Sequence, residues 1–226
     1  QSIIKYTPGG LSSVFATGLQ GVEGLTVDSA GNVFVTTLWD HNITKFTPGG
    51  VGSIFANTGG NDAYALAFDS AGNLYASEFN ANRIEKFTSD GVGSVFATGL
   101  NHPYGLAFDS AGSLYVANYH GQNIQKFAPG GGSSSIFASG LTDPAGIAFD
   151  AAGNLYVADQ WALPSYGEVI KFTPAGVGSV FYSGAYSGPI SIAIIPEPSS
   201  LALAGLMLAL AFIFRNRAKV RDVVPG

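Results

Sequence analysis

Short runs in which large apolar residues alternate with small or polar ones recur along residues 1–195. In the stretch 101–135, NHPYGLAFDSAGSLYVANYHGQNIQKFAPGGGSSS, the run GLAF places Leu106 and Phe108 on one face and Gly105 and Ala107 on the other. Alternation with a period of two is typical of a β-strand. The stretch, read on into SIFA, predicts four strands, GLAF, SLYVAN, NIQKF and SIFA, separated by turns rich in Gly and Pro.

This four-strand pattern is repeated along the chain. Three series of residues mark the copies: Asp28, Asp69, Asp109 and Asp150; Gly31, Gly72, Gly112 and Gly153; and Lys45, Lys86, Lys126 and Lys171. Successive Asp residues are separated by 41, 40 and 41 positions. A period of roughly 40 residues with four short strands is typical of a propeller blade. We therefore expect an all-β propeller of four-stranded antiparallel blades over residues 1–195.

The two ends of the repeat region match parts of a blade. Ser2–Tyr6 and Ser13–Ala16 match a third and a fourth strand, and 188–194 matches a first strand. A propeller commonly builds its last blade from both ends of the chain, so we expect about five blades with the closing one incomplete. The pattern also predicts an upstream piece with at least one strand like SLYVAN and a secretion signal, and a longer parent could have six blades.

The last 31 residues, 196–226, have a different pattern and form a second region. Pro196, Glu197 and Pro198 precede 199–214, which is apolar apart from two serines, and Arg215, Arg217, Lys219 and Arg221 follow within 215–221. Sixteen helical residues span about 24 Å, slightly less than the ~30 Å hydrocarbon core. A buried helix is one alternative. The basic cluster favours a short transmembrane helix with a cytoplasmic C-terminus.

Charge is distributed unevenly between the two regions. Residues 1–196 carry six Lys or Arg and thirteen Asp or Glu, a net charge of −7, whereas 197–226 carry four and two, a net charge of +2. A mildly acidic body argues against nucleic acid as a partner. The chain has no cysteine, so no disulfide framework is expected.

The tail resembles the PEP-CTERM sorting signal, in which Pro-Glu-Pro is followed by an apolar helix and a basic cluster. The resemblance implies an exported protein of a Gram-negative bacterium, anchored in the envelope membrane until an exosortase recognises and cuts the tail. It assigns recognition and retention to the residues that match: Pro196, Glu197, Pro198, Arg215, Arg217 and Lys219.

The repeats resemble the bacterial NHL-type propellers, which carry phrases of the form GLAFDSAGNLYVA and IxKFTPGG. The resemblance covers nearly all of 1–195 and implies the fold. These propellers include binding modules, lyases and lactonases, so function has to be inferred from the site.

The copies differ at one end of the predicted barrel. Antiparallel strands bring together the start of each first strand (Glu23, Tyr64, Tyr104, Ala145) and the end of each second strand (Thr37, Glu78, Asn118, Asp159). The opposite end carries the nearly identical DSAGN and TPGG turns. The Asp series is best explained by turn chemistry, and the Lys series by a solvated stripe on the third strands. The variable end is therefore the expected working face.

Aromatic side chains gather at this variable end in the sequence pattern. Aromatics offer rigid contact area for sugar rings or a peptide, so we expect binding of an exopolysaccharide or an envelope protein, without a cofactor. The expected residues are Trp39, Tyr64, Phe79, Tyr104, Tyr119, His120 and Trp161. The insertion 162–167 enlarges the same face. The alternative is that these rings only cap the blades.

An enzyme is the second interpretation. Glu23, Glu78, Asn118 and Asp159 offer oxygen ligands for Ca²⁺ or Mg²⁺, as in the gluconolactonase-like propellers that the repeats resemble. A thinner resemblance to virginiamycin B lyase would make His102 or His120 a base. Lone loop histidines, His41 among them, are more often polar surface.

Overall fold

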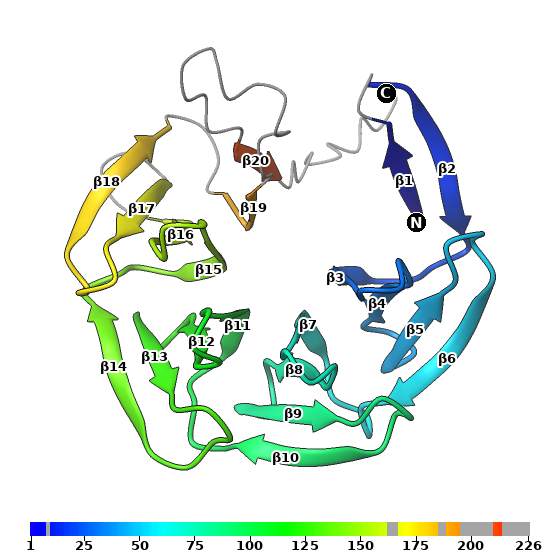
Figure 1. Cartoon of the computed structure of the whole chain (residues 1–226), viewed down its shortest axis with the longest axis horizontal. Helices are drawn as coiled ribbons and strands as arrows, with labels where there is room; N and C mark the ends of the chain where they lie inside the picture. Colours follow the sequence, from blue (N-terminus) through cyan, green and yellow to red (C-terminus); the bar gives the residue numbers. More distant parts are fainter. Residues whose placement is uncertain (8–9, 162–166, 185–188, 195–209, 214–226) are drawn as a thin grey trace, which may run out of the picture.

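The computed structural model describes residues 1–7, 10–161, 167–184, 189–194 and 210–213, and it is an all-β propeller. Four complete blades, each a four-stranded antiparallel sheet, follow one another around a ring with their first strands innermost (Figure 1). The described residues contain no helix. The predicted all-β propeller of four-stranded antiparallel blades is thus confirmed, with four complete blades among the described residues.

Each blade takes its strands in chain order from the axis outward. The first blade is β3 (Val22–Val27), β4 (Val33–Thr37), β5 (Asn42–Phe46) and β6 (Gly52–Asn57). The second is β7 (Ala63–Phe68), β8 (Leu74–Glu78), β9 (Arg83–Phe87) and β10 (Gly93–Ala97). The third is β11 (Pro103–Phe108), β12 (Leu114–Asn118), β13 (Asn123–Phe127) and β14 (Ser134–Ser139). The fourth is β15 (Pro144–Phe149), β16 (Leu155–Asp159), β17 (Glu168–Phe172) and β18 (Gly178–Ser183).

The repeated Asp closes the turn between the first and second strands of each blade. Asp28 Oδ1 accepts hydrogen bonds from the amides of Ala30 and Asn32 at 3.0 and 2.8 Å, and the other three Asp residues accept the equivalent pair. The Gly three positions on adopts a positive φ of 80–82° in every blade, which glycine tolerates without a steric penalty. The Asp series is therefore turn chemistry, as predicted.

The Lys series differs from the solvated stripe that the sequence suggested. Lys126 faces Tyr115 across β12 and β13, and its Nζ lies 4.9 Å from the centre of the Tyr115 ring. The equivalent pairs lie 5.3–5.4 Å apart: Lys45 with Phe34, Lys86 with Tyr75, and Lys171 with Tyr156. Each Lys is half-buried over an aromatic ring, so the stripe makes a cation–π contact in every blade.

Neighbouring blades are held together by apolar side chains and close backbone contacts. The second-strand ring of one blade sits edge-on between two Phe rings, as Tyr75 does with Phe96 and Phe108 at 5.0 and 4.9 Å. Nearer the axis, a Cβ placed on Gly105 would lie 2.2 Å from the carbonyl oxygen of Ala145 in the next blade. The inner strands are therefore close enough to require glycine there.

Strands at the two ends of the chain form two further, two-stranded sheets. β1 (Ser2–Tyr6) pairs with β2 (Ser12–Thr17) and packs on the first blade, whereas β19 (Ser191–Ile194) packs on β15 as the next first strand. β19 pairs with β20 (Leu210–Ile213). The predicted closing blade would have placed β19 with β1 and β2. In the structure the two sheets lie apart in the ring (Figure 1).

The ring of described strands is open between β19 and β3. Consecutive first strands touch one another from β3 through β7, β11 and β15 to β19, but β19 and β3 do not pack together among the described residues. Leu25 on β3 is consequently 49% exposed, whereas its counterparts Leu66 and Leu106 are 7% exposed. The described strands therefore form four complete blades and do not show the expected five-bladed closure.

Only four residues of the predicted C-terminal helix are among the described residues. Leu210–Ile213 forms β20, and the rest of 199–214 lies outside the described residues. No helix long and apolar enough to cross a membrane occurs in the part of the chain that the structure describes.

Candidate functional site

The variable end of the blades is assembled by the pairing of first and second strands. Ala63 pairs with Glu78, Pro103 with Asn118, and Pro144 with Asp159. The residue after each second strand also donates its amide to the carbonyl that precedes the first strand, as Tyr119 does to His102 at 3.0 Å. The sequence prediction that these loops lie at one end is confirmed.

A register shift occurs at the start of every first strand, between Ala63 and Leu66 in β7 and between Pro103 and Leu106 in β11. Tyr64 and Tyr104 lie inside these shifts. A β-bulge re-aims the side chains that it contains. The Ser77 hydroxyl fixes the bulge by accepting from Ala65 N at 3.0 Å and donating to Tyr104 O at 2.6 Å. The bulges therefore set how the two tyrosines are presented.

Six rings from the second and third blades form one contiguous group, which we call the aromatic cluster: Tyr64, Phe79, His102, Tyr104, Tyr119 and His120. Phe79 is its centre. Its ring stacks on Tyr64 at 4.6 Å and meets His102 edge-on at 4.6 Å. Tyr104 lies 5.1 Å from Tyr64 and 6.0 Å from Tyr119, and His120 lies 4.3 Å from His102.

The aromatic cluster extends to the fourth blade but not to the first. The Tyr119 hydroxyl donates to Gln160 Oε1 at 3.2 Å, and Trp161 lies within hydrogen-bonding reach of the same hydroxyl. Trp161 is 54% exposed. Trp39, on the first blade, lies beside Gly21 and is 72% exposed. Of the seven predicted binding residues, five are in the cluster, Trp161 is at its edge and Trp39 is apart. Residues 162–166 of the predicted loop insertion lie outside the described residues.

His102 was missing from the predicted binding residues, although it lies inside the cluster. The repeat contains the signal: His102 occupies the position of Asp62 and Asp143, which likewise precede first strands. Partial burial and the nearby His120 lower the pKa of His102 below its usual value. The lowered pKa favours the neutral ring, which can accept a proton or a hydrogen bond.

Glu78 is the most buried carboxylate at this end, with 0% of its surface exposed. Arg83 donates to its Oε2, and Oε1 has no hydrogen-bond partner among the described residues. Arg83 also lies 3.3 Å from Glu85 Oε2. Burial, with Glu85 close by, raises the pKa of Glu78 to about 7. Glu78 is thus engaged inside its own blade.

Asn118 and Asp159 are engaged in a similar way. Asn118 Nδ2 donates to Asn123 Oδ1 and Gln125 Oε1 at 3.0 and 2.9 Å. Asp159 accepts from the amides of Thr142 and Asp143 at 2.9 and 2.6 Å, while burial raises its pKa. Among the described residues, no three acidic or histidine side chains gather closely enough to hold a metal ion. Glu78, Asn118 and Asp159 are held by partners in their own blades, which does not suit coordination of Ca²⁺ or Mg²⁺, and we derive no step through a metal.

The sorting residues lie outside the described residues, but the sequence there is informative. Residues 195–218 match the PEP-CTERM protein-sorting motif. The chain carries an exosortase sorting signal. The motif marks an exported protein that is anchored in a membrane and then processed. Pro196, Glu197, Pro198, Arg215 and Arg217 fall inside the matched range, and Lys219 lies one residue beyond it.

Solved propellers share the fold. A virginiamycin B lyase from Staphylococcus aureus is 20% identical, with a TM-score of 0.65 over 76% of this chain and 59% of that chain. A chain of a nidogen/laminin complex is 24% identical (TM-score 0.71, 80% and 72%), and a gluconolactonase from Xanthomonas campestris is 18% identical (0.73, 85% and 72%). At these identities the likeness shows the fold alone. The chain spans about three-fifths of the length of the lyases that it matches. None of the curated proteins matches its sequence.

Proposed function

We propose that the chain is an exported binding module of the cell envelope, whose variable end holds an exopolysaccharide chain or an envelope protein through the aromatic cluster. The observation that carries this proposal is the continuous run of rings from Tyr64 through Phe79 and Tyr104 to Tyr119. Aromatic rings that are positioned by their neighbours lose little conformational entropy when a ligand covers them.

Polar groups are interleaved with these rings. Gln160 accepts from Tyr119, and His102 Nδ1 lies 3.1 Å from Asn101 Oδ1. A sugar has apolar faces and hydroxyl edges, and a surface of rings bordered by amides and imidazoles complements both. We favour a polysaccharide over a protein partner for this reason, and because the exported protein meets the extracellular matrix.

The tail delivers the propeller to this location in our proposal. The apolar segment 199–214 crosses the membrane, the basic cluster stays in the cytoplasm, and an exosortase cuts near Pro196-Glu197-Pro198 so that the propeller reaches the surface of a Gram-negative cell. Replacing Glu197 with Ala in the producing bacterium should leave uncut protein in the membrane fraction. Release unchanged from wild type would contradict this part of the proposal.

Direct titration of the full chain with exopolysaccharide from the producing bacterium tests the binding function. We expect Phe79→Ala and Tyr104→Ala to weaken binding at least tenfold. Tyr6→Ala is the control, because Tyr6 is exposed on β1 and outside the cluster. Unchanged affinity in both cluster variants would reject the proposal.

A lyase or lactonase is the second candidate, and the histidine pair favours it. His102 and His120 lie 4.3 Å apart, and the lowered pKa of His102 suits a general base. Turnover of a lactone or a streptogramin that is lost in His102→Gln and His120→Gln, but retained in His41→Gln, would establish this function. No turnover of either substrate by the wild-type chain would exclude it, and equal turnover in all three variants would exclude His102 and His120 as the base.

A further inference from the structure

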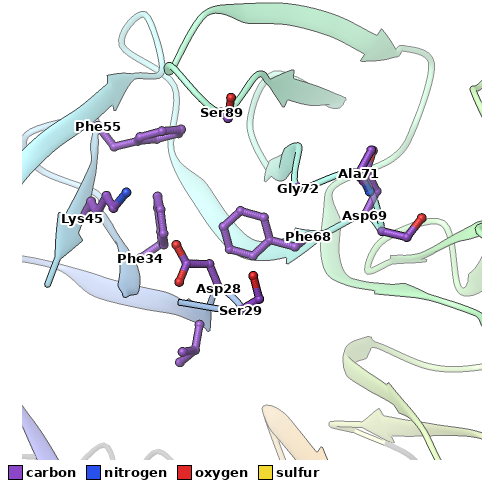
Figure 2. Close-up of a pocket in the computed structure, with 12 residues that line it drawn as sticks. Asp28, Ser29, Phe34, Lys45, Phe55, Phe68, Asp69, Ala71, Gly72 and Ser89 are labelled. Carbon is purple, nitrogen blue, oxygen red and sulfur yellow. Dashed lines mark hydrogen bonds between the residues drawn. The ribbon is translucent and has the colours of Figure 1, made fainter. Parts of the chain in front are cut away.

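A pocket of about 530 Å³ lies at the opposite end of the ring, where the repeated Asp turns lie, between the first and second blades (Figure 2). Its walls include Phe34, Lys45 and Phe55 from the first blade and Phe68, Asp69 and Ser89 from the second. Its volume lies in the range of small-molecule sites. The binding function proposed above does not use this end.

Phe34 is the first of two residues that depart from the repeat pattern and thereby open the pocket. The same position is Tyr75, Tyr115 and Tyr156 in the later blades. The Tyr75 hydroxyl donates to Asp69 at 3.2 Å, and the Tyr156 hydroxyl to Asp150 at 3.4 Å. Phe34 keeps the ring contacts with Phe55 and Phe68, at 5.0 and 5.1 Å, but has no hydroxyl to offer Asp28.

Ser89 is the second departure, and it falls at the same place. The later and earlier blades have a proline there, and that proline covers the glycine of the Asp turn. A Cβ on Gly31 would lie 3.5 Å from Pro48, and one on Gly153 would lie 3.6 Å from Pro174. A Cβ on Gly72, in the blade with Ser89, would have nothing within 4 Å. Two independent departures therefore remove atoms from one junction.

The charges around the pocket limit what it can hold. Lys126 and Lys171 form ion pairs with their turn Asp residues at 3.4 and 3.9 Å, and no such pair within 4.0 Å joins Lys45 to Asp28. Lys45 is held over the Phe34 ring at 5.3 Å. Asp28 and Asp69 together outweigh the single ammonium, which disfavours an anion, and Lys45 disfavours a cation.

We propose that this pocket binds one neutral sugar residue. A sugar hydroxyl takes the place of the missing tyrosine hydroxyl, donating to Asp28 and accepting from Lys45. The apolar face of the ring lies against Phe55 and Phe68, and further hydroxyls reach Ser29, Ser70 and Ser89. The pocket is separate from the aromatic cluster, so a glycan chain would have a second point of attachment on the propeller.

Saturation-transfer NMR of the full chain with methyl β-glucoside and methyl β-galactoside tests the proposal, with glucuronate as the anionic comparison. We expect millimolar binding of a neutral glycoside that weakens at least tenfold in Phe34→Tyr and in Ser89→Pro. Both variants restore residues that other blades carry, so both should fold, and thermal unfolding checks this. Tyr6→Ala, outside both the pocket and the aromatic cluster, should leave the binding unchanged.

A gain-of-site variant provides the matched control. Tyr75→Phe with Pro129→Ser copies both departures to the junction of the second and third blades, and it should double the number of glycosides bound. The proposal is overturned if no neutral glycoside binds, if binding persists in both filled variants, or if glucuronate binds more tightly.

Discussion

Arg83, at the start of β9, donates a hydrogen bond to the buried carboxylate of Glu78 at the end of β8. The pair is directly opposed across the two strands, and Glu85 approaches the same guanidinium from two positions further along β9. Two carboxylates therefore share one cation in a buried place. A proton held by Glu78 relieves the repulsion, which agrees with its raised pKa of about 7.

This arrangement predicts a pH-dependent stability. Because the folded pKa of Glu78 lies above its unfolded value of about 4.5, the native state keeps a proton that the unfolded chain releases between those values. Stability should therefore fall as pH rises from about 5 to 7.5, by up to ~1.4 kcal/mol per pH unit for this one group. Urea unfolding at several pH values should show a flatter profile for Glu78→Gln.

The exposed residue Asp40 supplies the control for this measurement. Asp40→Asn should keep the wild-type pH profile while Glu78→Gln becomes relatively more stable above pH 7. Parallel profiles for wild type and Glu78→Gln would show that Glu78 is ionised in the native state, contrary to our account.

Because the inner strands approach closely, adding a methyl group at Gly105 and removing one at Ala65 should change the stability by different amounts. Gly105→Ala would push a Cβ into the carbonyl of Ala145, so we expect the free energy of unfolding to drop by about 1–3 kcal/mol. The equivalent position of the second blade is already Ala65, and Ala65→Gly should cost roughly 1 kcal/mol or less. Chemical denaturation measures both. Equal effects would mean that the blades separate easily.

The lysine above each second-strand ring should stabilise the fold through its charge rather than through the length of its side chain. Lys126→Met keeps the aliphatic stem but loses the contact with Tyr115 and the ion pair with Asp109. We expect a loss of about 0.5–2 kcal/mol in the free energy of unfolding. Lys5 lies in the two-stranded sheet of β1 and β2, which has no second-strand ring beside it among the described residues, so Lys5→Met should be neutral. If neither variant changed the free energy of unfolding, the lysines would be the solvated stripe that the sequence suggested.

Much of the fold follows from local chemistry that a sequence displays directly. The Asp turn needs only residues within four positions, as Asp28 with Ala30 and Asn32 shows, so the strands between turns were predictable. Ring closure depends on the angle between blades, which no local pattern encodes. That is why each complete blade was predicted, whereas the described strands do not show the expected five-bladed closure.

The candidate site shows the same division. Tyr64 and Tyr104 were predicted because strand pairing alone places them at one end. The stacking of Phe79 on Tyr64 was not, because it depends on the bulges and on the separation of two blades. The partners of Glu78 and Asp159 were missed for a related reason: a carboxylate at a strand end can turn to the axis or to its own blade, and only Arg83 or the amides of Thr142 and Asp143 decide this.

The most direct test of the central claim uses the two tryptophans of the chain. Trp39→Phe leaves Trp161 as the single reporter, beside Tyr119 and the aromatic cluster. Titration with exopolysaccharide from the producing bacterium should change the Trp161 emission, with an affinity at least tenfold weaker when Tyr104→Ala is added. A signal that disappears with Trp39, or an affinity that Tyr104→Ala does not alter, would contradict binding at the aromatic cluster.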